Sequence, residues 1–503
     1  MAALGRQLLK NIFSSWGGYV VRLVITFFFV PYIAGVFGDA RYGVWVIVFQ
    51  TIAYFSLLDL GLSSALTRYV SRYLSERDFP AINRVLSTSS ALYLVIGSAV
   101  FGGIYLFVHL FFGYFRIGDP GLVEEGKRAL LVLGGFMAFN SYLLPWGNSL
   151  AAFQRHDITR LLAVFEELIR VVVMVWLIRE GYGLMALALV ILFASVAKHL
   201  VGGLWLRKLY PQVRLSGGGV TSATARMLLG YSKISFGITI GWLIIFNADT
   251  FLLGLLSSSA AAGVYNPGAQ LMLYLRNIVN SIGIPLTPAI SHVEAGGEMD
   301  KVRSVYLRGV KYVSYVSYVF LVGVVIYARP FVRLWLPAEF SEAATVMIIL
   351  SFGAAIFLPQ IIGNSVLFGI GQHRYILRTL VFESLAKIVL SVILIPKYDL
   401  VGMALANAVP QLVLYVTLFP YFMSRVLAVE MRKIVGLGLA TGMLGAVVSL
   451  PAALIVSRLL PPTGWGSFAA NVATVVAGSV FVGYFLLEKG DRQKLTALLN
   501  RSA

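Results

Sequence analysis

Long apolar runs recur along the whole sequence and constrain its fold more than any other feature. A helix needs about 20 mostly apolar residues to cross the hydrocarbon core of a bilayer. By this measure we mark about fourteen spans, near residues 12–37, 42–66, 85–112, 129–152, 159–179, 183–206, 234–256, 264–290, 306–327, 343–368, 376–395, 400–424, 434–456 and 467–487. Hydrophobic residues form 59% of the 503 positions and charged residues only 12%. The sequence therefore predicts an all-α polytopic membrane protein.

The charged residues are distributed unequally between the loops. The formal net charge is +18, and lysine and arginine are concentrated in every second loop between the apolar runs. This bias predicts that those loops and both chain termini are cytosolic. No long polar segment is present on which a nucleic-acid-binding patch could form. We therefore assign the positive charge to membrane loops and expect no nucleic-acid partner.

Several kinds of chemistry lack the residues that they need. Cysteine is absent and the five histidines are scattered, so thiolate chemistry is excluded and no metal-ligand spacing appears. The segment 121–128 resembles a phosphate-binding loop, but it lacks the Ser or Thr that holds magnesium. No Ser, His and Asp grouping marks a nucleophilic site. We expect a protein that is not an enzyme, with no catalytic residue, metal or cofactor.

Four short segments recur at an offset of about 216 to 220 residues: Gly43-Val44-Trp45 matches Gly263-Val264-Tyr265, Gly147-Asn148-Ser149 matches Gly363-Asn364-Ser365, Phe165-Glu166 matches Phe382-Glu383, and 185–188 matches 403–406. An even number of spans separates equivalent positions, so a pseudo-twofold axis along the membrane normal relates the two halves. We predict an N-lobe (helices 1–6) at 1–207, a cytosolic linker at 208–226, a C-lobe (helices 7–12) at 227–427, and helices 13 and 14 with a cytosolic tail at 428–503.

The first hundred residues carry a more specific pattern. It consists of Tyr42-Gly43-Val44-Trp45, YFSLLDLGL at 54–62, Arg68-Tyr69-Val70 and Ala81-Ile82-Asn83-Arg84. This pattern resembles the bacterial polysaccharide-biosynthesis flippases of the O-antigen (Wzx) type, which belong to the multidrug/oligosaccharidyl-lipid/polysaccharide (MOP) exporter superfamily. The resemblance implies two six-helix lobes around a central cavity, with two extra helices. It also implies a polyprenyl-pyrophosphate-linked oligosaccharide as substrate and the bacterial inner membrane as location.

Basic residues lie deep inside several apolar runs. At about 1.5 Å per residue, Arg22 lies about 15 Å into the first run and Arg276 about 18 Å into the eighth. An arginine at the bilayer centre costs about 2.5 to 3.5 kcal/mol on insertion scales, so it requires a wet cavity or an anion. Its planar guanidinium suits a phosphate group. We predict that Arg22, Arg276 and Lys198 bind the pyrophosphate, while Lys198 is also placed to extend to the cytosolic surface.

Two pairs of opposite charges are spaced four residues apart inside apolar runs. Glu166 precedes Arg170, and Glu383 precedes Lys387, with the acid first in both. This is the favourable order for an ion pair along a helix. The sequence predicts two intramembrane ion pairs.

Two buried aspartates have no partner at that spacing. Asp59 lies toward the cytosolic side of the second run, and Asp249 toward the outer side of the seventh. We predict that they couple transport to an ion or gate it. Pairing with Arg22 or Arg276, or a polar role at a helix end, also stays open.

Three prolines within the spans are candidate hinges. Pro31, Pro145 and Pro359 each remove a backbone hydrogen bond and bend a helix, although ordinary transmembrane proline explains them equally well. Gly438 and Gly442 form a GxxxG pattern, which favours packing inside the protein over a dimer interface.

The sequence as a whole predicts a flippase that works by ion-coupled alternating access. The expected partners are the lipid-linked glycan, membrane lipids, a proton or sodium ion, and polysaccharide polymerase or ligase machinery. Three alternatives stay open: a multidrug cation exporter of the same superfamily, a lipid II flippase, and a non-transporting scaffold for a polysaccharide synthase. The basic centre argues against cationic drugs.

Overall fold

The structure is a computed structural model that describes residues 2–55, 62–153, 155–214, 219–488 and 492. Some side chains within these ranges, including those of residues 2–22, are also outside the description. The described backbone is helical nearly throughout and contains no strand. Nine segments of the described residues are long and apolar enough to cross a membrane. The prediction of an all-α polytopic membrane protein is confirmed.

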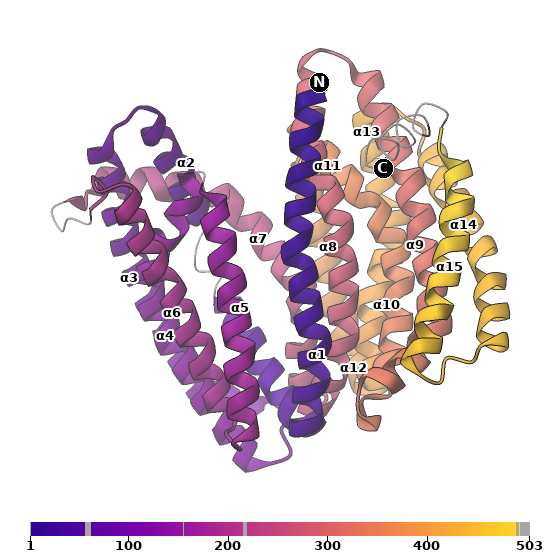
Figure 1. The fold of residues 1–503 in the computed structure, drawn as a ribbon, viewed down its shortest axis with the longest axis horizontal. Coiled ribbons are helices and arrows are strands. Elements are labelled where there is room, and N and C mark those ends of the chain that lie inside the picture. Colours follow the sequence, from indigo (N-terminus) through magenta and orange to yellow (C-terminus); the bar gives the residue numbers. More distant parts are fainter. Residues whose placement is uncertain (1, 56–61, 154, 215–218, 489–491, 493–503) are drawn as a thin grey trace. The chain divides into compact units, whose positions relative to one another are not determined.

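The chain packs as two compact units, which are Phe13–Gly263 (the N-terminal unit) and Val264–Ala503 with Met1–Ile12 (the C-terminal unit). The helices up to the end of the N-terminal unit are α1 (Ala2–Phe55), α2 (Leu62–Ser75), α3 (Phe79–Leu110), α4 (Pro120–Ala152), α5 (His156–Arg179), α6 (Leu184–Leu209) and α7 (Ser222–Leu256). Those that follow are α8 (Ser259–Ala295), α9 (Met299–Trp335), α10 (Ala343–Phe357), η5 (Leu358–Gln360), α11 (Ile361–Gly369), α12 (Arg374–Val416), α13 (Leu418–Leu427), α14 (Met431–Leu459) and α15 (Trp465–Leu486). Figure 1 shows these elements in sequence colours.

Two of the long helices, α1 and α12, each contain a sharp break. Each break falls between two predicted spans, which therefore share one helix. In α1 the break is at Gly38, whose φ of 69° suits glycine. Directly after the break, the Asp39 carboxylate accepts the Ala40 N–H at 2.6 Å. In α12 the break is at Asp399, with φ 51°. Asp and Asn tolerate this left-handed conformation better than most residues.

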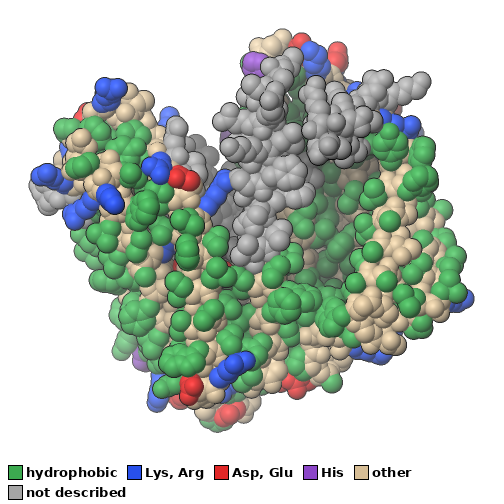
Figure 2. Space-filling view, in the orientation of Figure 1, with side chains coloured by type: hydrophobic (Ala, Val, Ile, Leu, Met, Phe, Trp, Pro, Cys, Tyr) green, Lys and Arg blue, Asp and Glu red, His purple; other side chains and the backbone are tan. Residues whose placement is uncertain are grey.

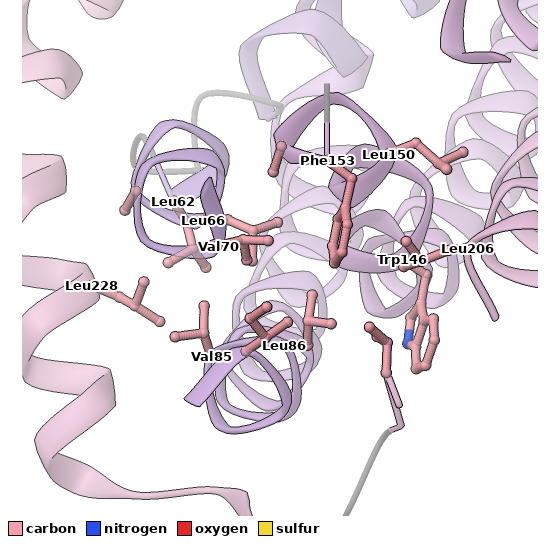
Figure 3. Packing of buried hydrophobic residues seen from close by; sticks show 14 of the residues in the cluster. Leu62, Leu66, Val70, Val85, Leu86, Trp146, Leu150, Phe153, Leu206 and Leu228 are labelled. Carbon is pink, nitrogen blue, oxygen red and sulfur yellow. The ribbon is translucent and has the colours of Figure 1, made fainter. Parts of the chain in front are cut away.

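The N-terminal unit is held by an apolar cluster where α2, α3, α4 and α6 meet. Leu66 of α2, Val85 of α3, Phe153 after α4 and Leu206 of α6 are all almost fully buried in it. Figure 3 shows these side chains pointing toward one another. Leu228 of α7 joins the same cluster. Burial of each such side chain contributes about 1.5 to 3 kcal/mol.

This packing of α7 bears on the predicted lobes. The compact N-terminal unit includes α7 and the first turn of α8, whereas the sequence prediction starts the C-lobe at residue 227. Besides Leu228, α7 contributes Gly254, where an added Cβ would lie 2.4 Å from the Ile47 side chain of α1. The structure therefore groups α7 with the helices before it, and the lobe boundaries stay a prediction.

In the C-terminal unit, α14 packs along α9, and α10 packs against both α9 and α12. A Cβ on Gly442 would lie 2.6 Å from the Tyr318 ring of α9, and one on Gly438 would lie 3.4 Å from Ser314 Oγ. The two glycines thus let α14 approach α9 closely. The expectation that this GxxxG pattern serves internal packing is confirmed.

The surface fits a membrane environment. Figure 2 shows apolar side chains along the helices, with Lys, Arg, Asp and Glu gathered mainly toward the helix ends. Large apolar residues such as Phe28, Val95, Phe193 and Phe481 are more than half exposed. Exposed apolar side chains of this extent indicate contact with lipid in a polytopic protein.

Candidate anion and proton site

The candidate site is built on a helical hairpin within α12. The Asp399 break divides α12 into two arms. The arms run in opposite directions, since Ser391 contacts Met403 and Glu383 contacts Tyr415 across the break. An added Cβ on Gly402 would lie 2.2 Å from the Leu394 carbonyl oxygen, so only glycine allows the arms to approach this closely. The first arm carries Glu383 and Lys387, and the second carries Gln411 and Tyr415. The hairpin thereby brings residues far apart in sequence together.

Glu383 is the centre of the site. Only 2% of its surface is exposed. Its carboxylate accepts a hydrogen bond from the Tyr415 hydroxyl at 2.9 Å and another from the Gln411 Nε2 at 3.3 Å. A buried carboxylate needs such donors and a counter-charge, because its desolvation is costly.

Two cations supply the counter-charge. Lys387, with 1% of its surface exposed, lies one helical turn after Glu383, and Arg276 comes from α8. Both attract the Glu383 carboxylate electrostatically. The Nε and Nη1 atoms of Arg276 are shielded from solvent. Two cations and one carboxylate leave one formal positive charge in this buried site.

The predicted ion pairs of the N-terminal unit have different partners from those expected. Glu166 pairs with Lys198 of α6 at 2.8 Å, and Arg170 pairs with Glu167, three residues before it. The prediction of a Glu166–Arg170 pair is therefore wrong. A helix places both i+3 and i+4 neighbours within reach, and Lys198, on the neighbouring helix, reaches Glu166. Phosphate binding by Lys198 stays a prediction.

Asp249 occupies a separate polar position in the N-terminal unit. Its surface is 6% exposed and that of the adjacent Thr250 is 2% exposed. The carboxylate interacts electrostatically with Tyr54 of α1. Its coupling or gating role stays a prediction. The other two predicted residues of this kind, Asp59 and the side chain of Arg22, lie outside the described residues.

The three prolines occupy different local structures. Pro31 and Pro145 lie inside α1 and α4, and the Ser149 hydroxyl donates to the Pro145 carbonyl group. Pro359 lies in η5, the short 3₁₀ turn that separates α10 from α11. A 3₁₀ segment between helices is a common location for bending. The hinge role of all three prolines stays a prediction.

A small pocket of about 30 Å³ lies in the C-terminal unit and shares Tyr415 with the Glu383 site. It lies between α9, η5, the end of α12 and α14, and its polar lining comes from Ser314, Tyr318, Gln360 and Tyr415. Neither the pocket nor the roles of Gln411 and Tyr415 were predicted from the sequence. For Gln411 and Tyr415, a sequence signal does exist: both are polar side chains inside the apolar run 400–424.

The N-terminal part of the chain matches a known protein family. The family model described as polysaccharide biosynthesis protein matches residues 8–294, more than half of the chain. The chain belongs to this family. Within the described residues of this family member, no group of three or more His, Asp and Glu is placed to hold a metal ion.

Three comparisons place this polysaccharide biosynthesis protein among membrane proteins. It is 20% identical over 498 residues to an uncharacterized membrane protein, EpsK, of Bacillus subtilis, covering 96% of both chains. Its fold is similar to the lipid II flippase MurJ in an inward closed conformation, with a TM-score of 0.72, 13% identity, and 94% of this chain and 98% of MurJ covered.

The fold is also similar to an inward-facing multidrug resistance MATE family transporter of the MOP superfamily. The TM-score is 0.68 at 15% identity, over 82% of this chain and 99% of the transporter. At this level of identity the likeness shows the fold. The predicted membership of the polysaccharide-biosynthesis family, and the predicted superfamily fold, are confirmed.

Proposed function

We propose that this protein is a flippase that moves a polyprenyl-pyrophosphate-linked oligosaccharide from the cytosolic to the outer leaflet of the bacterial inner membrane. The polysaccharide biosynthesis family supports a glycan substrate. The fold shared with a lipid II flippase and a MATE transporter supports transport across a membrane. Both chain termini are assigned to the cytosol from the distribution of Lys and Arg.

The observation that carries the proposal is the charge of the buried C-terminal site. Arg276 and Lys387 face one carboxylate, Glu383, so the site has an excess of positive charge inside apolar surroundings. A pyrophosphate diester carries two negative charges and presents oxygens to the guanidinium fork of arginine. Arg22 is the proposed second phosphate ligand, from the other repeat.

Other substrates fit this charge less well. A cationic drug requires acidic groups at the binding site, and the excess positive charge here repels it. A lipid II flippase would use the same phosphate chemistry and differs in the glycan. A scaffold for a polysaccharide synthase would not need a buried cationic site, because a charge inside the membrane is costly and marks function.

The proposed mechanism is alternating access between two repeats. No nucleotide-binding motif is present in the sequence, so we assign the driving force to an ion gradient, with a proton or sodium ion as the coupling ion. The glycan would pass through a wet cavity while the polyprenyl chain stays in the bilayer. Polymerase or ligase machinery would consume the exported glycan.

The proposal can be tested by mass spectrometry of the lipids that remain bound after gentle purification. The wild type is compared with Arg276→Ala, with Arg22→Ala and with the double variant. Arg458→Ala is the control, because this arginine is exposed near the end of α14. We expect a polyprenyl-pyrophosphate glycan on the wild type and the control, and its loss from the double variant.

Each alternative gives a different result in this experiment. A wild type that carries the polyprenyl-pyrophosphate disaccharide-peptide would indicate a lipid II flippase. A wild type that carries bulk phospholipid alone would contradict the proposal. A glycan that stays on the double variant would keep the function and reject the two arginines as its site.

A further inference from the structure

A row of three aromatic rings joins the start of α12 to α13 in the C-terminal unit. The ring centres of Tyr375, on α12, and Phe422, on α13, lie 5.0 Å apart. The ring centres of Phe422 and Tyr421 lie 6.0 Å apart. Phe422 is buried, whereas Tyr421 is exposed. The middle of the row is therefore fixed by packing inside the unit, and one end of the row reaches the surface.

Three arginines lie over this row and form, together with it, what we call the arginine surface. The guanidinium groups of Arg374 and Arg378 lie 5.0 and 5.7 Å from the centre of the Tyr375 ring. The guanidinium of Arg425 lies 5.5 Å from the centre of the Tyr421 ring. A ring face attracts a cation, and the N–H groups of a guanidinium suit the oxygens of a phosphate. The rings thereby position three phosphate-binding groups.

The charge of these three arginines is not balanced by neighbouring acids. Within the part of the chain that the structure describes, no carboxylate forms an ion pair with Arg374, Arg378 or Arg425. Other basic residues of the same unit do have such partners, as Lys301 does in Glu298 at 2.7 Å. Three positive charges without an acid favour an anion as the ligand of this surface.

An exposed apolar stripe continues from the arginines along the first arm of α12. Arg374 and Arg378 are exposed, and Val381 and Leu385 follow them with 48% and 58% of their surfaces exposed. The spacing of these four residues places their side chains on one face of the helix. This face thus presents cations at one end and apolar side chains beyond them, which matches the chemistry of a lipid with an anionic head group.

The internal repeat shows that the arginine surface belongs to one half of the chain. At the offset that relates residues 185–188 to 403–406, Tyr375 corresponds to Asp157. Asp157 pairs with Arg155 at 2.9 Å. At this position the N-terminal half therefore has an acid that neutralises its own arginine, whereas the C-terminal half has a ring under two arginines.

We propose that the arginine surface binds an anionic phospholipid of the cytosolic leaflet, with its head-group phosphate at the three arginines and its acyl chains along Val381 and Leu385. The distribution of Lys and Arg assigns this end of α12 to the cytosolic side. Basic clusters next to membrane-spanning helices attract anionic lipids. A nucleic acid or an acidic peptide would use the arginines and leave the apolar stripe unused. Because the ligand is a membrane lipid and not the transported glycan, this binding is independent of the flippase proposed above.

The binding can be measured with one fluorophore placed beside the arginine surface. The sequence contains no cysteine, so Leu377→Cys, at an exposed position between Arg374 and Arg378, provides a single labelling site. The labelled protein is reconstituted in phosphatidylcholine liposomes that contain a small fraction of phosphatidylglycerol with a nitroxide quencher near its head group. Nitroxide-labelled phosphatidylcholine gives the reference. We expect the association constant for phosphatidylglycerol to be higher by about fivefold or more, which one arginine near an anionic head group suffices to give.

Two sets of variants, made in the labelled protein, separate the arginines from the rings. The triple variant Arg374→Gln, Arg378→Gln and Arg425→Gln should bind both lipids equally. Tyr375→Leu keeps all three positive charges and should lower the preference for phosphatidylglycerol, because two arginines lose the ring that positions them. Tyr375→Phe keeps the ring and should keep the preference. Quenching by phosphatidylcholine, which should be the same in every variant, checks that each one is correctly reconstituted.

The matched control is the triple variant Arg329→Gln, Arg333→Gln and Arg458→Gln, which removes the same formal charge from exposed positions of the C-terminal unit. It should keep the preference for phosphatidylglycerol. Equal quenching by both lipids in the labelled protein would overturn the proposal. A preference that persists without the three arginines of the surface, or that the control also abolishes, would do the same.

Two further outcomes concern the ligand and the rings. Inorganic phosphate, added at constant ionic strength, should leave the preference for phosphatidylglycerol unchanged. If it abolished the preference, the surface would be a site for free phosphate, and the assignment to a lipid would be wrong. An unchanged preference in Tyr375→Leu would overturn the role of the aromatic row.

Discussion

The carboxylate of Glu383 and the hydroxyl of Tyr415 lie 2.9 Å apart, on opposite arms of the α12 hairpin. In the N-terminal unit, Glu166 of α5 and Lys198 of α6 lie 2.8 Å apart. The two glutamates are equivalent in the internal repeat, and each contacts the next span of its own half. The repeat thus preserves a glutamate, and its contact on the next span is a cation in one half and a tyrosine hydroxyl in the other.

The Glu166–Lys198 pair should show a measurable coupling energy. Its side chains are 15% and 28% exposed, so the pair is only partly screened. A double-mutant cycle with Glu166→Gln and Lys198→Met should give a coupling of about 0.5 to 1 kcal/mol in the free energy of unfolding. The matched cycle with Glu166→Gln and Arg170→Met should give a value near zero. Equal coupling in the two cycles would contradict the observed pairing.

The repeated glycines Gly43 and Gly263 should not tolerate a side chain. Both belong to the N-terminal unit, where a Cβ on Gly43 would lie 1.7 Å from the Ser259 carbonyl oxygen and one on Gly263 would lie 2.4 Å from that of Asp39. Forced overpacking of this kind costs about 1 to 3 kcal/mol or more. Gly43→Ala should therefore lower the melting temperature by several degrees, measured by thermal shift in detergent.

The control for this substitution is Gly478→Ala, because an added Cβ there meets open space. Alanine has the higher helix propensity, so this variant should keep or slightly raise the melting temperature. A Gly43→Ala variant as stable as Gly478→Ala would contradict the close approach of α1 at Gly43 to the start of α8.

The Arg41–Glu125 ion pair should stabilise the protein only while the guanidinium binds both carboxylate oxygens. The guanidinium donates to both carboxylate oxygens, at 3.0 and 2.6 Å, and Glu125 also accepts the Leu184 N–H at the start of α6 at 2.7 Å. Glu125→Gln should destabilise the protein by about 1 to 3 kcal/mol. Arg41→Lys should not substitute for arginine, because lysine lacks the planar fork.

Chemical unfolding of both variants in detergent measures these losses. The exposed pair Lys127–Glu124, three residues apart on α4, provides the comparison. Glu124→Gln should leave the free energy of unfolding nearly unchanged, because solvent screens an exposed ion pair. A Glu125→Gln variant with the same small effect would show that the Arg41–Glu125 contact does not stabilise the fold.

The sequence predicts the helices well because apolar length is a local property. It also marks Arg276, Glu383 and Lys387, since a charge within an apolar run stands out. The sequence does not predict which residues of neighbouring helices these charged residues contact. The pairing of Glu166 with Lys198 follows from the packing of α5 on α6, and the bond from Tyr415 follows from the hairpin at Asp399. Neither arrangement leaves a spacing that can be recognised in one sequence.

The repeated Gly-Asn-Ser motif illustrates the same limit. The sequence shows the repeat but not its purpose. In the structure, a Cβ on Gly147 would lie 2.2 Å from the His199 ring, and one on Gly363 would lie 2.6 Å from the Phe419 ring. Each glycine makes room for a ring from another helix, which depends on tertiary packing alone.

The most direct test of the central claim is transport of a lipid-linked oligosaccharide in proteoliposomes. The polyprenyl-pyrophosphate glycan that copurifies with the protein is reconstituted with it, and an impermeant glycosidase added outside measures the glycan that reaches the outer leaflet. We predict protein-dependent cleavage beyond the initially exposed fraction, strongly reduced in Arg276→Ala and unchanged in Arg458→Ala. Cleavage that stays at the level of protein-free liposomes would contradict the claim that this protein is a flippase.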